Sequence, residues 1–421
     1  MNARPNHRRR RRLFDVLGPG LVTGAADDDP SGIATYSQAG AQFGYGMAWT
    51  MFFGFPLLAS IQAICAQIGA TTGMGIAQNL RQFYPRPLLQ AVVVLLLVAN
   101  VINLGADLGA MAAALDLLLP GPLLLYTVVF GTVSVLAEVF ISYTRYARWL
   151  KWTTLSLFAY VAVVFVADVP LGEAVRATLV PSFTFDKPHA MALVAIFGTT
   201  ISPYLFFWQS GQEVEEQHRR HVKPLCVSPR RKGAELARIR MDTLVGMGFS
   251  HLVALFIIVA TAATLHAHGV TNIETAAQAA QALRPIAGDL AFALFAIGII
   301  GTGMLAVPVL AGSAAYAVSE AFGWTEGLDR KPREAKAFYG VIALATLGGV
   351  ALNFVGVDPM KALYWAAVVN GLLAPPLMLV TMLIARNRKA MGGMPISRRL
   401  AFGGWLSTAV MAAVAAVFLL V

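Results

Sequence analysis

The chain has 421 residues, of which 57% are hydrophobic and only 13% charged, and its mean hydropathy is +0.66. A composition this apolar excludes an ordinary soluble domain and indicates a polytopic α-helical protein embedded in a lipid bilayer. The formal net charge of +10 has to be interpreted by position, because lysine and arginine orient the loops of membrane proteins.

The chain begins with a basic segment, residues 1–12, that contains the run Arg8 to Arg12. A basic cluster beside a first span usually holds the N-terminus in the cytoplasm; contact with nucleic acid or anionic lipid is the alternative interpretation. We expect no nucleic-acid partner. We also expect no cleaved signal peptide, because carboxylates interrupt the apolar stretch that follows.

Three consecutive carboxylates, Asp27, Asp28 and Asp29, lie inside the first apolar stretch. A charge at the centre of a spanning helix costs about 3 kcal/mol or more, so such residues are usually buried in the bundle and functional. Pro30 removes a helical hydrogen-bond donor and Gly32 loosens the backbone, which predicts a break that offers free carbonyls and amides to a ligand. A solvated loop between two short helices is the alternative. We favour a cation site on an unwound helix.

Apolar runs of about 20 residues predict eleven spans. The expected spans cover approximately residues 16–43, 47–70, 88–115, 122–143, 149–169, 190–210, 243–265, 290–321, 337–354, 360–385 and 400–421. Lysine and arginine concentrate in alternate loops along the whole chain, which supports both this count and a cytoplasmic N-terminus. Compact loops and the lack of an organellar signal suggest a bacterial inner membrane.

The sixth predicted span, like the first, contains polar and helix-breaking residues inside an apolar stretch. It carries Gly198, Thr199, Thr200, Ser202 and Pro203 in mid-membrane. Broken helices at matching places in two halves are typical of transporters built from inverted repeats, with the site at the midplane. A simple proline kink is the alternative. The expected organisation is one transmembrane domain over residues 13–421, with repeat one at about 13–175, repeat two at about 188–390 and an extra helix at about 398–421.

The sequence around the first break also contains a longer pattern. It comprises Gly18-Pro19-Gly20, Asp29-Pro30-Ser31-Gly32-Ile33-Ala34-Thr35, Ala39-Gly40-Ala41, Gly44-Tyr45 and Trp49. This pattern resembles the Nramp family of divalent-metal transporters, and the resemblance extends over essentially all the spans. It implies an all-α polytopic membrane protein with the LeuT-type fold: two inverted five-helix repeats plus an eleventh helix, with helices one and six broken. It also implies a transporter whose metal ion is substrate rather than cofactor.

The family binds manganese or iron between Asp-Pro-Gly-Asn in its first helix and Met-Pro-His in its sixth. By this resemblance, Asp29 stands at the metal-binding aspartate and Thr199 at the position whose carbonyl faces the ion. Gly32 replaces the expected binding asparagine and Ser202 replaces the expected methionine. The fold assignment survives these departures, but the substrate does not follow automatically.

The departures favour a harder cation. A thioether favours transition metals, whereas Mg²⁺ prefers oxygen ligands and tends to keep several waters. The residues expected to offer oxygens or to frame a hydrated ion are Asp28, Asp29, Ser31, Gly32, Thr199, Thr200 and Ser202. The sequence is similar to the Nramp-related magnesium transporters, so we expect Mg²⁺ to be favoured over Mn²⁺ or Fe²⁺.

The departures also bear on proton coupling, which in the family uses acids and histidines. Tyr204 and Gln209 stand where histidines are expected, and Asn103 and Ala106 where the acids of the third helix are expected, although Asp107 lies beside them. Since proton relays need chains of Asp, Glu or His, we expect weak or no proton coupling.

Alternatives to this interpretation remain open at the level of sequence. They are a proton-coupled Mn²⁺ or Fe²⁺ importer, an amino-acid carrier of LeuT type, and an intramembrane enzyme that uses Asp27 to Asp29 with Asp107. The chain has no nucleotide-binding P-loop, so transport is expected to be secondary or passive. Three aspartates at the break argue against an anionic ligand there. The oligomeric state, monomeric or higher, is not predicted.

Three further features have more ordinary interpretations. Residues 213–240 are expected to form a solvated cytoplasmic linker between the repeats, since their histidines and cysteine match no zinc pattern. Asn370 is expected to be a satisfied asparagine beside a proline kink rather than a cavity residue. Glu138 is expected to hydrogen-bond to a neighbouring helix.

Overall fold

The computed structural model describes residues 19–141 and 153–421, and these residues form helices and connecting loops without any strand. The basic segment 1–12 and the start of the predicted fifth span therefore lie outside the described residues. The helices are α1 (Pro19–Asp27), α2 (Pro30–Phe43), α3 (Trp49–Thr72), α4 (Ile76–Phe83), α5 (Arg86–Asp116), α6 (Leu123–Phe140), α8 (Phe158–Val166), α9 (Leu171–Leu179), α10 (Lys187–Thr200), α11 (Pro203–Arg219), α12 (Lys232–Thr264), α13 (Ala276–Ala280), α14 (Arg284–Ala287), α15 (Ala291–Phe322), α16 (Lys336–Leu352), α17 (Pro359–Arg386) and α18 (Arg398–Leu420).

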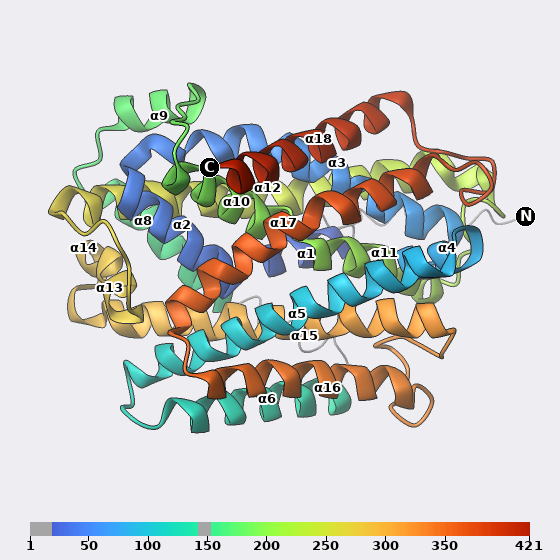
Figure 1. Cartoon of the computed structure of the whole chain (residues 1–421), viewed down its shortest axis with the longest axis horizontal. Coiled ribbons are helices and arrows are strands. Elements are labelled where there is room, and N and C mark those ends of the chain that lie inside the picture. The colour runs from blue at the N-terminus through green and yellow to red at the C-terminus, as the bar shows by residue number, and fades with distance from the viewer. Residues whose placement is uncertain (1–18, 142–152) are drawn as a thin grey trace, which may run out of the picture.

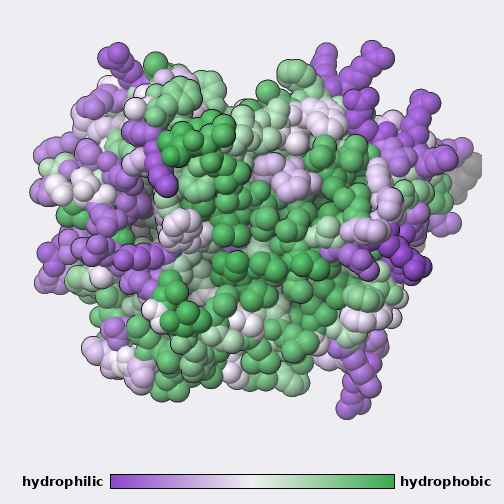
Figure 2. All heavy atoms as spheres, in the orientation of Figure 1, coloured by the Kyte–Doolittle hydropathy of each residue, from purple (hydrophilic) through white to green (hydrophobic). Residues whose placement is uncertain are grey.

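The long helices run roughly along one direction, and their connecting loops gather at two ends of the bundle (Figure 1). A broad hydrophobic belt separates two hydrophilic ends on the face shown in Figure 2. We name these ends by the central helices: α1 begins and α11 finishes at the α1 end, whereas α2 finishes and α10 begins at the α2 end. The molecule is an integral membrane protein.

Nine helical segments in the described part of the chain are long and apolar enough to cross a membrane. They correspond to the predicted spans two, three, four and six to eleven. The first predicted span is divided into α1 and α2, each too short to cross alone. Of the fifth, the structure describes the turn Thr153–Leu157 and helix α8.

The two predicted helix breaks are confirmed, and proline chemistry explains both. Helix α2 begins with Pro30 at its first turn, and the Asp29 side chain caps it by accepting from the Gly32 amide. Helix α11 also has a proline, Pro203, at its first position, although the Ser202 side chain before it does not cap the helix. Because proline has no N–H, each break frees the carbonyl four residues earlier, on Ala26 and on Thr199.

Close backbone contact holds α1 in the bundle. A Cβ added to Gly24 would lie 2.3 Å from the carbonyl oxygen of Gly246 on α12, and one added to Gly20 would lie 2.9 Å from the Asp242 backbone. Two glycines one helical turn apart thus let α1 pack directly on α12, as small residues do at helix interfaces in membranes. The half-helix is closely packed although it has only nine residues.

The prediction of a solvated linker at residues 213–240 is wrong. Most of the segment is the end of α11 and the start of α12, so it lies within the second set of five helices. Arg238 pairs with Glu213 and, at 2.7 Å, with Glu235; Arg220 pairs with Glu235 at 2.8 Å. Glu213 and Glu235 are buried, because the arginines neutralise them where two helices pack together.

Candidate metal centre

Asp29 lies between the two halves of the first broken helix and is almost fully buried, with 1% of its surface exposed. Its Oδ1 accepts from the Gly32 amide and from the Ser31 hydroxyl, both at 2.7 Å. The Tyr204 hydroxyl of α11 lies 3.0 Å from Asp29 Oδ2 and 3.3 Å from the freed carbonyl of Ala26. Tyr204 therefore connects the second broken helix to both halves of the first.

Asp27 and Asp28 face a different neighbour. The Ser250 hydroxyl of α12 lies 2.7 Å from Asp27 Oδ2 and 3.1 Å from Asp28 Oδ1. The other two oxygens, Asp27 Oδ1 and Asp28 Oδ2, are buried without a hydrogen-bond partner among the described residues. Buried carboxylate oxygens without donors are costly unless a cation or proton reaches them.

The second break meets the first through small polar groups. The hydroxyls of Ser31 and Thr199 lie 3.3 Å apart. A Cβ added to Gly32 would lie 3.4 Å from the Thr199 hydroxyl and 3.3 Å from the Asp27 carbonyl. The Ser202 hydroxyl is directed back to its own helix and lies 2.6 Å from the Thr199 carbonyl oxygen, which Pro203 leaves without its helical donor.

The predicted site residues thus fall into two adjoining groups. Asp29, Ser31, Gly32 and Thr199 surround one point where the breaks face each other, and Ser202 contacts this point through the Thr199 carbonyl. Asp28 instead shares Ser250 with Asp27. The donors at the breaks are carboxylate, hydroxyl and carbonyl oxygens.

Asp107 on α5 belongs to this site, although the sequence interpretation did not include it among the metal ligands. It is fully buried, both its carboxylate oxygens are without hydrogen-bond partners in the described structure, and it interacts electrostatically with Asp29 and with the Ser31 amide. The signal was present in the sequence, because an aspartate inside an apolar span is a functional candidate by default. The resemblance had directed attention to Asn103 and Ala106 instead.

Asn103 and Asn370 bind each other rather than the centre of the break. Their carboxamides exchange two hydrogen bonds, of 2.9 and 3.1 Å, between α5 and α17. This confirms the interpretation of Asn370 as a satisfied asparagine. The expectation for Glu138 is wrong: its two carboxylate oxygens are buried and have no hydrogen-bond partner among the described residues.

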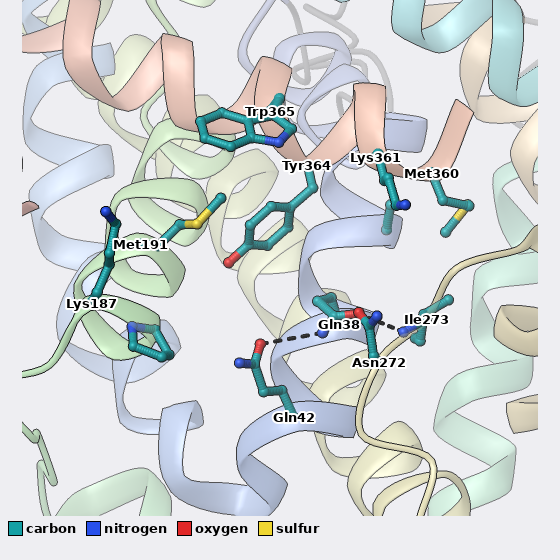
Figure 3. A pocket seen from close by; sticks show the side chains of 12 residues that line it. Gln38, Gln42, Lys187, Met191, Asn272, Ile273, Met360, Lys361, Tyr364 and Trp365 are labelled. Atoms are coloured by element: carbon teal, nitrogen blue, oxygen red, sulfur yellow. Dashed lines mark hydrogen bonds between the residues drawn. The ribbon is translucent and has the colours of Figure 1, made fainter. Parts of the chain in front are cut away.

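A cavity of about 440 Å³ opens at the α2 end, between α2, α10, α17 and the loop that follows α12. Tyr364 and Met191 point into it (Figure 3). Gln38 of α2 holds the loop by accepting from the Ile273 amide at 2.8 Å and donating to the Thr271 carbonyl at 3.3 Å. Because this cavity also borders α2 at Ala34, it approaches the break from the α2 end.

At the α1 end, by contrast, hydrogen bonds hold α1 against its neighbours. The Gly20 amide donates to Asp242 at 2.7 Å, and the Thr23 hydroxyl donates to Gln209 at 2.5 Å. These bonds fix α1 to α12 and α11. The structure therefore combines a cavity that approaches the break from the α2 end with tight packing of α1 at the other end, the arrangement that alternating access requires of one of its states.

Comparison with known proteins agrees with this architecture. The family profile described as natural resistance-associated macrophage protein-like (Nramp) matches residues 20–421. The chain belongs to the Nramp family. Family membership makes it a transporter rather than an enzyme, and the intramembrane-enzyme alternative is set aside.

The Nramp relatives include the divalent metal cation transporter MntH of Deinococcus radiodurans, which is 26% identical over 407 residues that cover 94% of this chain and 87% of that protein. MntH of Klebsiella pneumoniae is 25% identical, with 94% and 91% covered. In these relatives the metal is transported and is not a cofactor.

Solved structures show the same fold. The manganese transporter of Eremococcus coleocola, in complex with an aromatic bis-isothiourea compound, superposes with a TM-score of 0.76 at 16% identity, covering 98% of this chain and 87% of that one. MhsT in complex with L-phenylalanine superposes with a TM-score of 0.61 at 12% identity, covering 99% of both chains. The predicted LeuT-type fold is confirmed.

Proposed function

We propose that this Nramp protein is a secondary transporter that moves a divalent metal cation through the break between α1 and α2, with Mg²⁺ favoured. The observation that carries the proposal is the position of Asp29, a buried carboxylate at the point where both broken helices meet. A divalent cation would offset the cost of burying this charge.

The oxygen donors near Asp29 support a hard cation. Asp107 supplies a second carboxylate from α5, and Ser31 and Thr199 supply hydroxyl or carbonyl oxygens. Ser202 supplies a hydroxyl where the family resemblance leads us to expect a thioether. Mg²⁺ is bound through one or two carboxylates and keeps several waters, and Gly32 places no side chain beside these donors, where a Cβ would already lie 3.3 Å from the Asp27 carbonyl oxygen.

We infer that the α1 end faces the cytoplasm of a bacterial inner membrane. The support is the concentration of lysine and arginine in the loops at that end. The cavity beside Gln38 would then lead outward, and release of α1 from α12 would open the path inward. Transport in this account is passive or weakly coupled to protons, because α11 carries Tyr204 and Gln209 rather than histidines.

A proton-coupled Mn²⁺ or Fe²⁺ importer is the second candidate, and two observations favour it. Asp107 and Asp29 interact, and paired carboxylates can share a proton. A Cβ added to Gly303 would lie 2.5 Å from the Met111 sulfur and 3.2 Å from the Pro30 ring, so a thioether from α5 lies near the break. Substitution Met111→Leu separates the candidates: it lowers the Mn²⁺ to Mg²⁺ uptake ratio only if this sulfur selects the ion.

Metal binding to the purified protein tests the favoured proposal. We expect Asp29→Asn to weaken Mg²⁺ binding at least about 10-fold in isothermal titration calorimetry, since a charged ligand is lost. Glu138→Gln is the matched control, because it removes another buried carboxylate that lacks hydrogen-bond partners among the described residues. Equal affinity in the wild type and the Asp29→Asn variant would refute the proposed site.

A further inference from the structure

A second cavity lies at the α1 end, outside the proposed path of the metal. It has a volume of about 700 Å³ and is formed by the end of α17, the start of α18 and the loop between them. Arg386, Arg388 and Arg398 line it together with Phe402 and Trp405. No acidic residue lines this cavity. It therefore combines positive charge with an aromatic wall.

The three arginines have no ion-pair or side-chain hydrogen-bond partner among the described residues. Two arginines elsewhere at this end differ in this respect, because Arg220 and Arg238 both bind buried glutamates. A guanidinium presents five donors in a rigid fork that matches phosphate and carboxylate oxygens. Three unpaired guanidinium groups around one cavity are suited to bind an anionic ligand, since no carboxylate of the protein lines this cavity.

The local backbone also favours an anion and fixes the position of the loop that lines the cavity. The Ile396 amide donates to the Ala385 carbonyl at 3.3 Å, which anchors the loop to the end of α17. Helix α18 begins beside the cavity, with Ser397 as its cap. The amino end of a helix carries partial positive charge and favours an anion within the first turn.

The cavity borders the hydrophobic belt. Phe402 is 71% exposed and Leu406 is 44% exposed on α18, which lies on the outside of the bundle in Figure 1. Trp405 is half-buried, as expected of an aromatic residue at the membrane–water boundary. A ligand that fits here has an anionic head for the arginines and an apolar part for the outer face of α18.

We propose that this cavity binds the phosphate headgroup of an anionic phospholipid from the surrounding bilayer, with its acyl chains along Phe402 and Leu406. Basic pockets between membrane helices are suited to such headgroups. Residues 1–12 of this chain do not suit the cavity as an alternative occupant, because that segment and the cavity are both positively charged. The lipid would bridge the ends of α17 and α18 and so hold the eleventh helix against the tenth.

Lipid binding by the full chain in neutral detergent tests this proposal. A fluorescent phosphatidylglycerol is titrated against the wild type and against the triple variant Arg386→Gln, Arg388→Gln and Arg398→Gln. We expect at least about 10-fold weaker binding in the variant, since charge-assisted bonds are lost. The single variant Arg388→Gln, on an exposed loop residue, is expected to lose affinity without any change in thermal midpoint.

A second triple variant controls for total charge. Arg230, Arg231 and Arg333 lie at the same end and line neither this cavity nor the metal path, and replacing all three with glutamine removes the same charge. This variant is expected to bind the lipid as the wild type does. Equal losses in both triple variants, or none in the cavity variants, would overturn the proposal. Displacement of the lipid by inorganic phosphate at equal concentration would identify a free-phosphate site and overturn it too.

Discussion

Asn103 and Asn370 join α5 to α17 by two reciprocal hydrogen bonds between buried side chains. Each carboxamide donates to the other's oxygen, so the pair satisfies itself without a charge or a proton. By family resemblance, Asn103 stands where an acid of the proton route is expected. An uncharged, hydrogen-bonded asparagine pair at this position supports the proposal of weak proton coupling.

The first prediction concerns this asparagine pair. Asn370→Ala leaves the Asn103 carboxamide with an unmade buried bond, so we expect a loss of about 1–2 kcal/mol in stability. The double variant Asn103→Ala with Asn370→Ala is expected to lose less than the sum of the two single variants, because both partners leave together. Thermal unfolding in detergent measures this. Additive losses would show that the two side chains act independently.

The second prediction concerns ion selectivity. Ser202→Met places a thioether beside the Thr199 carbonyl, and we expect the ratio of Mn²⁺ to Mg²⁺ uptake to rise at least about 10-fold, because sulfur stabilises the softer ion. Ser202→Ala is the control, since it removes the same hydroxyl without adding sulfur. Identical ratios in the two variants would show that ligand softness at this position does not determine selectivity.

The third prediction concerns closure of the α1 end. Gly24→Val inserts a side chain where even a Cβ would lie 2.3 Å from the Gly246 carbonyl. We expect α1 to separate from α12 and transport to fall. In a Thr23→Cys background that the test and control variants share, we expect Gly24→Val to increase the reaction of Thr23→Cys with a water-soluble maleimide. Gly172→Val is the control, because a Cβ there would meet nothing within 4 Å. If Thr23→Cys reacts with the maleimide no faster in the Gly24→Val variant, the proposal that Gly24 allows α1 to pack on α12 is contradicted.

The fourth prediction concerns pH and Glu326, which lies in the loop between α15 and α16. Burial, with Glu320 and Glu215 nearby, raises the pKa of Glu326 to about 9. The folded state therefore keeps a proton that the unfolded chain releases near its ordinary pKa of about 4.3, so stability falls as pH rises between these values. We expect Glu326→Gln to flatten the decline in thermal midpoint between about pH 5 and pH 9. An unchanged slope would contradict this assignment.

Sequence reasoning located the two helix breaks because they depend on local chemistry. Pro30 and Pro203 break their helices wherever the rest of the chain packs, and buried aspartates in apolar sequence need a function. The contribution of Asp107 was missed, since it depends on which face of α5 meets the break. The same limit applies to residues 213–240: the burial of Glu213 by Arg238 requires contact between two helices whose packing no local pattern specifies.

The preference of Asp28 for Ser250 could not be predicted either. Three adjacent aspartates at a helix break point in different directions, and their partners come from α11 and α12, about 175 to 223 residues away in sequence. The family resemblance could therefore single out Asp29, whereas only the structure shows that Asp29 meets Tyr204 of α11 while Asp27 and Asp28 meet Ser250 of α12.

Cation uptake by the purified protein in liposomes tests the central claim most directly. The experiment compares Mg²⁺, Mn²⁺ and Ca²⁺, with Asp29→Ala as the control for the site. We predict uptake of Mg²⁺ and Mn²⁺ that Asp29→Ala abolishes, with no stoichiometric acidification of the lumen. Uptake that persists in Asp29→Ala, or Mn²⁺ uptake that excludes Mg²⁺, would contradict the account of an oxygen-lined divalent-cation site at the first helix break.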